Sequence, residues 1–193
     1  MNILIEGDNG TGKDTLAMAF QPQFNIITYH DEIQQKMDFA RTFKGRAQTL
    51  KFLDYNASCG HIMEDYTKSG IDSITIRYWP STITAAYADG KLTEAECDLL
   101  VDVCMATFAM PDLIIFLVCN HNERVRRIVL RNSPNFDDKS VERAMRYAYY
   151  SKKIMNRLGK IVHRVSTNGR TREDIQNEVR EIINRGVPYE RAG

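Results

Sequence analysis

The chain alternates between short apolar segments and longer segments in which apolar residues recur at helical spacing. The short segments are rich in β-branched side chains and are flanked by polar or turn-forming residues, which predicts strands. The predicted strands are Asn2–Ile5, Asn25–Tyr29, Ser73–Arg77, Leu113–Val118 and Ile161–Val165. Strands that alternate with helices are typical of a parallel sheet with helices on both faces. We therefore expect an α/β fold with a five-stranded parallel sheet flanked by helices.

Two long helices are predicted between the strands. The first covers Arg46–Lys68 and ends at Ser69-Gly70, and the second begins with a capping box of Thr93 and Glu96 and ends before Pro111. Their predicted apolar faces are Leu50, Leu53, Ala57 and Met63 in the first helix and Leu99, Leu100, Val103 and Phe108 in the second. Both helices are long enough to form the walls of a cleft above the sheet.

The composition predicts one globular domain that spans residues 1–193. Of the 193 residues, 43% are hydrophobic and 26% are charged, as in ordinary globular proteins. Two polar segments are predicted outside regular structure. Residues 131–139 lie between two helices, where either a mobile lid or an ordinary surface loop fits, and residues 187–193 form a short flexible tail.

Charge and cysteine content narrow the class of protein. The 26 basic and 25 acidic residues give a formal charge of +1, so no global field attracts nucleic acid. The four cysteines (Cys59, Cys97, Cys104 and Cys119) show no C-x-x-C spacing and are predicted to be reduced and buried. No apolar run approaches a membrane span, and no basic region precedes Glu6, so we expect a soluble cytoplasmic protein without membrane contact.

The segment after the first predicted strand carries the most specific chemical signal. Gly7, Gly12 and Lys13 have G-x-x-x-x-G-K spacing, in which backbone N–H groups surround a phosphate and the lysine reaches the β and γ oxygens of a nucleotide. The helix expected next would direct its positive N-terminal end at the same anion. We expect an ATP-binding loop formed by Gly7, Asn9, Gly10, Thr11, Gly12, Lys13, Asp14 and Thr15.

Asp14 departs from the usual form of this motif, in which a Ser or Thr after the lysine binds magnesium. Either Asp14 binds Mg2+ directly as a carboxylate ligand, or it favours the helix N-terminus while Thr15 supplies the hydroxyl ligand. Both readings stay open, and both residues are candidate metal ligands.

Three further motifs make the chain resemble the thymidylate kinase family, with deoxynucleoside kinases as the next relatives. The segments Ile76-Arg77-Tyr78, Ser81-Thr82 and Ala86-Tyr87 are similar to the D-R-Y, S and A-Y pattern of that family. Pro111-Asp112-Leu113 is similar to its P-D-L before an apolar strand, and Arg126-Arg127-Ile128 with Arg131 matches its lid. Phe52-Leu53-Asp54-Tyr55-Asn56 stands where the family has A-A-D-R. The resemblance covers roughly residues 1–155.

The resemblance implies a P-loop NTPase fold with a lid and in-line phosphoryl transfer from ATP with Mg2+. In such a reaction the protein contributes positioning and charge neutralisation. Lys13, Arg77, Arg127 and Arg131 would stabilise the transferred group, although Arg77 also suits a surface strand end and the other two arginines a solvated helix face. The predicted substrate contacts are Asn9, Glu32, Asn56, Trp79 and Tyr87, although the two aromatic residues also suit a place in the core. A homodimer through the long helices is also implied.

The chain departs from the family pattern at the acceptor. Thymidylate kinases carry R-E-P where this chain has Tyr29-His30-Asp31-Glu32, and an arginine where it has Asn56. Those arginines normally hold the monophosphate of the acceptor, so a neutral hydroxyl is the alternative acceptor. Asp31 or Glu32 would then act as the base, although Asp31 equally suits a helix N-cap. Ile76 also replaces the aspartate before the arginine.

Three functions remain open from the sequence. The first is a deoxynucleoside monophosphate kinase of thymidylate kinase type. The second is a kinase of a hydroxyl, either on a deoxynucleoside or on 5-hydroxymethyluracil in DNA, as in some viral relatives that act in the host cytoplasm. DNA would then contact basic residues interleaved with aromatic ones, namely Lys36, Arg41, Lys44 and Arg46 with Phe39 and Phe43, which also suit a solvated helix face. The third is a slow NTPase or nucleotide-binding module.

Overall fold

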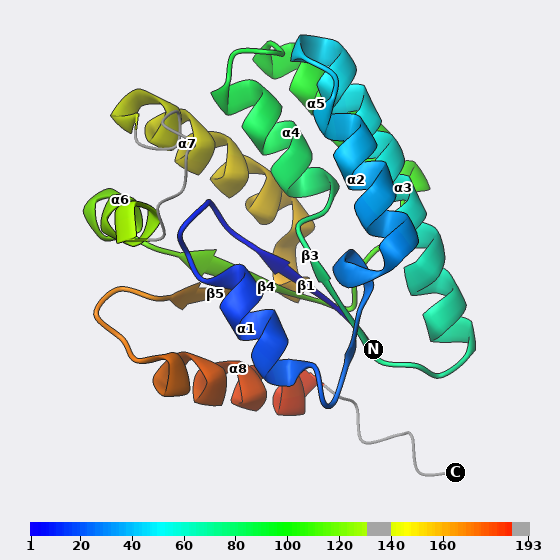
Figure 1. Ribbon diagram of the computed structural model, residues 1–193, viewed down its shortest axis with the longest axis vertical. Coiled ribbons are helices and arrows are strands. Elements are labelled where there is room, and N and C mark those ends of the chain that lie inside the picture. Colours follow the sequence, from blue (N-terminus) through cyan, green and yellow to red (C-terminus); the bar gives the residue numbers. More distant parts are fainter. Residues whose placement is uncertain (131–139, 187–193) are drawn as a thin grey trace.

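The structure, a computed structural model, describes residues 1–130 and 140–186. Five strands form one parallel sheet in the order β2-β3-β1-β4-β5. They are β1 (Asn2–Glu6), β2 (Asn25–Ile26), β3 (Ser73–Ile76), β4 (Leu113–Val118) and β5 (Val162–Ser166). β1 lies at the centre, between β3 and β4, and the loop after its carboxyl end leads into α1 (Figure 1). This arrangement confirms the predicted α/β fold.

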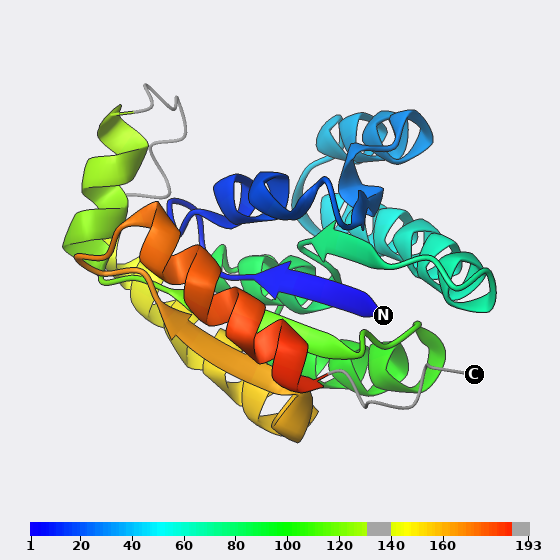
Figure 2. The ribbon, with the colours of Figure 1, turned by 90° about the horizontal axis from the view of Figure 1, so that it is seen from below.

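Eight helices cover the sheet in the described part of the chain. They are α1 (Lys13–Phe20), α2 (Asp31–Arg41), α3 (Gly45–Lys68), α4 (Trp79–Ala88), α5 (Glu94–Thr107), α6 (His121–Leu130), α7 (Val141–Leu158) and α8 (Arg172–Gly186). Short 3-10 helices occupy Ile27–Tyr29 and Gly159–Ile161. α1 and α8 lie on one face of the sheet, whereas α3, α4, α5 and α7 lie on the other (Figure 2).

Side-chain alternation along the strands builds the two hydrophobic layers. In β1, Ile3 and Ile5 face α1 and α8, whereas Leu4 faces the layer formed with α3, α4 and α7. Successive side chains of a strand point to opposite faces, so a strand covered on both sides must be apolar throughout. All five residues of β1 are buried, and the last of them is the charged Glu6.

The second predicted strand is shorter than expected. Strand pairing ends at Ile26, and Ile27–Tyr29 form a 3-10 helix that leads into α2. Ile27 is fully buried in the layer beneath α3, so it reaches the core without belonging to a strand. The apolar residues of this run are therefore buried as predicted, but the predicted strand does not continue beyond Ile26.

The inner face of α5 matches the prediction only in part, since Leu100 and Phe108 pack against the core whereas the other two residues do not. The capping box of Thr93 and Glu96 is present, but Cys97, Val101 and Cys104 are the buried residues of the helix. Leu99 is 64% exposed and Val103 47% exposed, and Leu50 of α3 is likewise 59% exposed. Both helices carry apolar residues on more than one side, so periodicity alone did not decide which side faces the core.

Other sequence predictions concern single features of the chain. All four cysteines are free, three are buried, and Cys119 is partly exposed. None of the described helices combines the length and apolarity needed to cross a membrane. The predicted lid at 131–139 and the predicted tail at 187–193 lie outside the described residues.

Candidate functional site

The loop between β1 and α1 has the backbone geometry of an anion site. Gly7 has φ of 140°, and a Cβ at this position would lie 2.5 Å from the Leu117 carbonyl oxygen. Gly12 has φ of 97° and serves as the N-cap of α1 without a side-chain cap, and no atom lies within 4 Å of where its Cβ would be. The N-terminal end of α1 therefore has no side-chain cap, and its first N–H groups suit a phosphate.

Lys13 lies folded against this loop. Its side chain is only 3% exposed, and Nζ donates a hydrogen bond to the Asp8 carbonyl oxygen at 2.7 Å. Burial and, secondarily, the Arg77 guanidinium lower the pKa of Lys13 to about 7. A bound phosphate would reverse this effect, because an adjacent anion favours the charged ammonium.

Glu6 is a buried carboxylate directly behind the loop, and sequence reasoning missed it. Its side chain is 1% exposed, and Oε1 accepts a hydrogen bond from the Tyr78 N–H at 2.9 Å. Burial raises the pKa of Glu6, whereas Arg77 and Lys13 act against that rise. The available signal was a charged residue at the end of an otherwise apolar strand, immediately before the glycine-rich motif. Buried carboxylates with perturbed pKa values are enriched in functional sites.

Arg77 lies beside the loop as the resemblance implied. Among the described residues it is the one non-glycine with positive φ, at 63°, and its N–H donates to the Ile5 carbonyl at 3.1 Å. Its guanidinium donates a hydrogen bond to Asn9 Oδ1. A left-handed conformation is costly for a long side chain, and such strain is typical of functional sites. The turn at Arg77 aims its side chain from β3 back across the end of β1.

Asp8 joins the loop to the two helices that flank residues 131–139. Its carboxylate forms an ion pair with Arg124 of α6 at 3.0 Å and faces Arg143 of α7 at 3.7 Å. Arg124 is 2% exposed and also donates to the Asn9 carbonyl at 3.3 Å. The sequence did not indicate either arginine as a site residue, because both lie more than a hundred residues from the loop in the chain.

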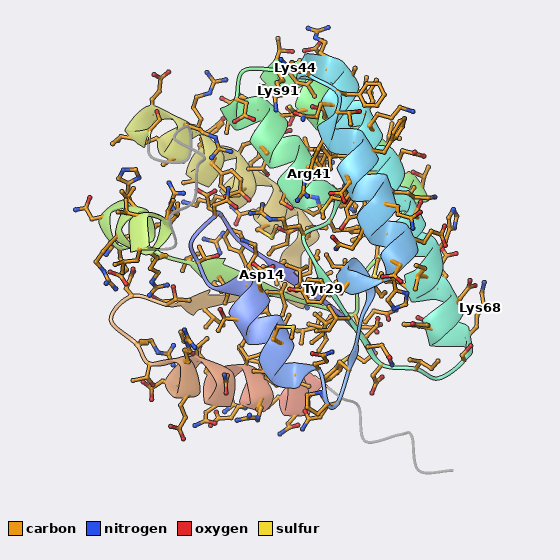
Figure 3. All side chains as sticks on the ribbon, viewed as in Figure 1. Asp14, Tyr29, Arg41, Lys44, Lys68 and Lys91 are labelled. Atoms are coloured by element: carbon orange, nitrogen blue, oxygen red, sulfur yellow. The ribbon has the colours of Figure 1, made fainter. Side chains whose placement is uncertain are left out.

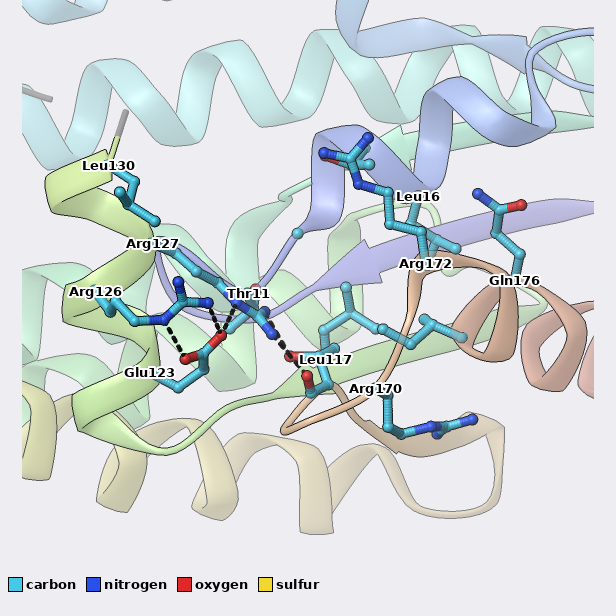
Figure 4. A pocket seen from close by; sticks show the side chains of 14 residues that line it. Thr11, Leu16, Leu117, Glu123, Arg126, Arg127, Leu130, Arg170, Arg172 and Gln176 are labelled. Carbon is cyan, nitrogen blue, oxygen red and sulfur yellow. Dashed lines mark hydrogen bonds and ion pairs between the residues drawn. The ribbon is translucent and has the colours of Figure 1, made fainter. Parts of the chain in front are cut away.

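A first cavity lies between α1, α6 and α8 and has a volume of about 330 Å3 (Figure 4). Thr11, Gly12 and Thr15 form its loop wall. Four arginines line the other sides, namely Arg126, Arg127, Arg170 and Arg172. Arg127 links α6 to the segment after β5, because its guanidinium donates to Glu123 at 2.8 Å and to the Thr167 carbonyl at 2.7 Å. We call this space the donor cavity.

A second cavity, of about 410 Å3, lies on the other side of the loop, between α2, α3, α4 and α7. We call it the acceptor cavity. Its loop wall includes Asp8, Asn9 and Asp14. Phe52, Tyr55 and Tyr147 provide aromatic walls, and its further charged or amide side chains are Gln34, Arg41, Gln48, Asn56, Arg77, Lys91 and Arg143. Its size and mixed lining suit a small polar ligand with a flat ring.

Asn56 lies in the wall of the acceptor cavity, as expected for a substrate residue. It is 1% exposed, and Nδ2 donates to Thr82 Oγ1 at 2.7 Å. Its Oδ1 has no hydrogen-bond partner in the described structure. A buried amide oxygen without a partner is costly, and a ligand that donates a hydrogen bond there would remove the cost.

Four predicted substrate or base residues lie away from the acceptor cavity. Trp79 is 1% exposed and packs in the hydrophobic core, because it opens α4 on its inner side. Tyr87 stacks on Tyr150 with ring centroids 4.8 Å apart and does not line the cavity. Asp31 and Glu32 are exposed in the first turn of α2, and the N-cap of that helix is His30 rather than Asp31. Arg131 lies outside the described residues.

The two predicted metal ligands, Asp14 and Thr15, line different sides of the loop. Asp14 is exposed on the acceptor side of the loop, where Tyr29 OH donates to its Oδ1 at 3.4 Å, and Thr15 lines the donor cavity. Within residues 1–130 and 140–186, no cluster of three or more His, Cys, Asp or Glu residues is suited to a metal. Mg2+ in nucleotide enzymes takes only one or two protein oxygens and completes its shell with phosphates and water, so Asp14 and Thr15 fit that need.

Comparison with known proteins places the fold. No protein-family model and no curated protein matches the sequence. Among solved structures, thymidylate kinase from Candida albicans superposes with a TM-score of 0.77 at 18% identity, over 96% of this chain and 92% of that one. Deoxyadenosine kinase from M. mycoides superposes with TM-scores of 0.65 in its dATP complex and 0.63 in its dCTP complex, both at 14% identity. In both comparisons the whole deoxyadenosine kinase chain is aligned, with 95% and 96% of this chain respectively. The chain therefore has the α/β P-loop fold found in these kinases.

Proposed function

We propose that the protein is a kinase that transfers the terminal phosphoryl group of ATP to a deoxypyrimidine nucleotide or nucleoside. The observation that carries this proposal is that one loop separates two cavities. Thr11 and Gly12 line the donor cavity, whereas Asn9 and Asp14 line the acceptor cavity. A phosphate held by the loop would lie between two ligands, which is the arrangement that direct transfer requires. The similarity to solved structures of thymidylate kinase and deoxyadenosine kinase supports the proposal.

The residues of the chain would act mainly by position and charge. Lys13 and the N–H groups of the loop hold the phosphates of the nucleotide, and Arg77 and Arg143 approach the transferred group from the acceptor side. The arginines of the donor cavity surround the rest of the nucleotide, with Arg127 held in place by Glu123 and Thr167. Asp14 or Thr15 would hold Mg2+, which would supply further charge neutralisation.

The first candidate acceptor is a deoxynucleoside monophosphate. The order of the motifs around Gly7, Arg77 and Pro111 favours it, since this order is similar to that of thymidylate kinases. The cations on the wall of the acceptor cavity, which include Arg41 and Lys91, would also stabilise a negatively charged acceptor. These two cations are not at the positions where thymidylate kinases carry their acceptor arginines.

The second candidate acceptor is a hydroxyl, on a deoxynucleoside or on 5-hydroxymethyluracil in DNA. It is favoured by the charge at the loop end of the cavity, where Arg77 and Arg143 are matched by Asp8 and Asp14. A doubly charged phosphate acceptor beside ATP would be poorly compensated there. Since Asp31 lies outside the cavity, the carboxylates available as the base are those of the loop that line it, namely Asp8 and Asp14.

Transfer of labelled phosphate from ATP with Mg2+ tests the proposal. The acceptor panel is dTMP, dUMP, dCMP, thymidine and DNA with or without 5-hydroxymethyluracil, and the Lys13→Ala variant is the control. Label on dTMP would support the first candidate, and label only on thymidine or on modified DNA would support the second. Release of inorganic phosphate alone, unaffected by any acceptor, would leave only the slow NTPase of the third hypothesis.

A homodimer is the proposed quaternary structure. Leu50 of α3 and Leu99 and Val103 of α5 are exposed apolar side chains. The two helices are linked by an ion pair of Arg46 and Glu96 at 2.9 Å. Burial of these side chains against a second copy would explain their apolar character. Sedimentation velocity of the wild type and of a Leu99→Glu variant tests this, and a monomeric wild type would contradict it.

A further inference from the structure

The two ends of the acceptor cavity differ in their charged side chains. At the loop end, the cations Arg77 and Arg143 line the cavity together with the carboxylates Asp8 and Asp14. At the other end, Arg41 and Lys91 line the cavity, and none of the described carboxylates lines it there. Net positive charge facing the cavity is therefore concentrated at the end away from the phosphate loop.

Arg41 lies far from the phosphate loop because of the direction of α2. This helix begins just after Tyr29, whose hydroxyl contacts Asp14, and Arg41 is its last residue. Since α2 has 11 residues, its two ends are about 15 Å apart. Figure 3 shows Lys44 and Lys91 near the top of the view and Arg41 between them and the pair Asp14 and Tyr29. Arg41 is held by Asp38, one turn earlier and outside the cavity, at 2.8 Å.

Lys91 is positioned by the turn that ends α4. Gly90 has φ of 67°, and the Lys91 N–H donates to the Ala86 carbonyl at 2.9 Å, which turns the chain back over the helix. The Lys91 ammonium donates to Gln48 Oε1 at 3.1 Å and lies 2.9 Å from Asp89. Asp89 also pairs with Arg143 at 2.7 Å, so one carboxylate is shared between two cations. Lys91 therefore shares its carboxylate partner with Arg143, and its side chain lines the cavity as a cation.

We propose that Arg41 and Lys91 bind a phosphate ester that the acceptor already carries, at the end opposite to its reacting group. The ligand class is a nucleotide, free or within a DNA strand, whose phosphate and reacting hydroxyl lie at opposite ends. This inference rests on the proposed kinase function. It selects the hydroxyl acceptor and gives its orientation, with the phosphate toward the end of α2 and the hydroxyl toward the phosphate loop.

The transfer step follows from this orientation. The hydroxyl oxygen of the acceptor forms a bond to the γ phosphorus of ATP, and the bond between that phosphorus and the β–γ bridging oxygen breaks. The hydroxyl proton passes to a carboxylate of the loop end, and ADP leaves with the electron pair of the broken bond. The phosphate at Arg41 and Lys91 takes no part in bond making and acts only in binding.

Binding measurements at several salt concentrations test the inference. The ligands are thymidine, thymidine 3′-monophosphate, thymidine 5′-monophosphate and a five-residue oligothymidylate, and the proteins are the wild type, Arg41→Gln, Lys91→Gln and the control Lys68→Gln. Lys68 is an exposed lysine and the last residue of α3, and it pairs with Asp65 at 3.5 Å (Figure 3). Circular dichroism and ATP affinity show whether each variant is folded.

We expect the wild type to bind at least one phosphate-bearing ligand about tenfold more tightly than thymidine, with an affinity that falls as salt rises. Arg41→Gln and Lys91→Gln should each lose most of this preference and reduce the salt slope by about one, whereas Lys68→Gln should keep both. Thymidine affinity should be the same in all four proteins. Preference for the mononucleotide or for the oligonucleotide identifies which source of phosphate the site takes.

Two results would overturn the inference. One is equal affinity of the wild type for thymidine and for every phosphate-bearing ligand. The other is a phosphate preference that survives in Arg41→Gln and Lys91→Gln and disappears in Arg143→Gln, which would put the acceptor phosphate at the loop end. In either case transfer from ATP to an acceptor can still occur, so the kinase proposal is judged separately by the Lys13→Ala control.

Discussion

The two sides of the phosphate loop differ in how far a short sequence determines them. On the donor side, the part expected to hold the phosphate is contiguous in the chain, from Gly7 to Phe20, and only the other walls of the donor cavity come from distant segments. On the acceptor side, the cavity is assembled from α2, α3, α4 and α7, which together span more than a hundred residues of sequence. The donor site can therefore be recognised from a motif, whereas the acceptor site depends on packing. Specificity is expected on the side that the motif does not describe.

The largest expected effect is that of Lys13→Ala on the donor side. Removal of one charge-stabilising group in a buried site typically costs about 3 kcal/mol of transition-state stabilisation, so turnover should fall by roughly a hundredfold or more. Acceptor binding in the absence of ATP should change little. Steady-state kinetics with each substrate varied in turn check this, with Lys68→Ala as the matched control. A loss of acceptor affinity as large as the loss of turnover would show that the donor and acceptor sites do not act independently.

Gly7→Ala should destabilise the loop more than Gly12→Ala does. A Cβ at Gly7 meets the Leu117 carbonyl at 2.5 Å, whereas a Cβ at Gly12 meets nothing within 4 Å. Both variants place alanine at an unfavourable positive φ, but only Gly7→Ala adds a clash with backbone. We therefore expect Gly7→Ala to lose about 1–3 kcal/mol more in the free energy of unfolding than Gly12→Ala does. Urea unfolding of the two variants measures the difference, and equal losses would contradict the packing argument.

Asn56→Leu tests the acceptor side at one position. Leucine removes the amide whose oxygen has no partner, so affinity for the acceptor should fall about tenfold, the effect of one lost hydrogen bond in a buried site. ATP affinity should stay unchanged, because Asn56 does not line the donor cavity. Calorimetric titration with each ligand separates the two. Unchanged acceptor affinity would mean that Asn56 has only a structural role through Thr82.

A separate prediction concerns the pH dependence of the free energy of unfolding. Because the pKa of Lys13 is about 7 in the folded protein, against 10.5 for an ordinary lysine, the unfolded chain binds more protons between these values. Stability contributed by this residue should therefore rise as pH increases from 7 toward 10.5, by at most about 1.4 kcal/mol per pH unit. Urea unfolding of the wild type and of Lys13→Met over this range should show a flatter profile in the variant. Identical profiles would contradict the lowered pKa.

The same lysine affects nucleotide binding in the opposite direction. Free protein above pH 7 must gain a proton at Lys13 when phosphate binds, so ATP affinity should decrease as pH rises through 7 and proton uptake should accompany binding. Titration calorimetry in buffers of different ionisation enthalpy measures that uptake. Binding without proton uptake at pH 8 would show that Lys13 is already charged in the free protein.

Much of the fold could be predicted because its signals are local. β-branched apolar runs marked the sheet, and Thr93 with Glu96 marked the start of α5. The inner face of α5 could be predicted only in part, because Leu99 and Cys97 are both apolar and only packing selects between them. Trp79, two residues after Arg77, was predicted to contact the substrate, but the direction of α4 places its side chain in the core.

The charged partners of the site were the least predictable part. Asp8 is an ordinary loop residue in the sequence, and its contacts with Arg124 and Arg143 arise because α6 and α7 begin beside the loop. Lys91 enters the acceptor cavity only because Gly90 turns the chain after α4. Such contacts join residues that no short motif contains, and they require the folded arrangement of several helices.

The most direct test of the central claim is the dependence of ATP turnover on an acceptor. If the loop lies between a donor site and an acceptor site, ATP consumption with Mg2+ should be slow alone, should rise at least tenfold when the correct deoxypyrimidine acceptor is present, and should yield one phosphorylated acceptor for each ADP. Turnover that is the same with and without every acceptor, with inorganic phosphate as the product, would contradict the account.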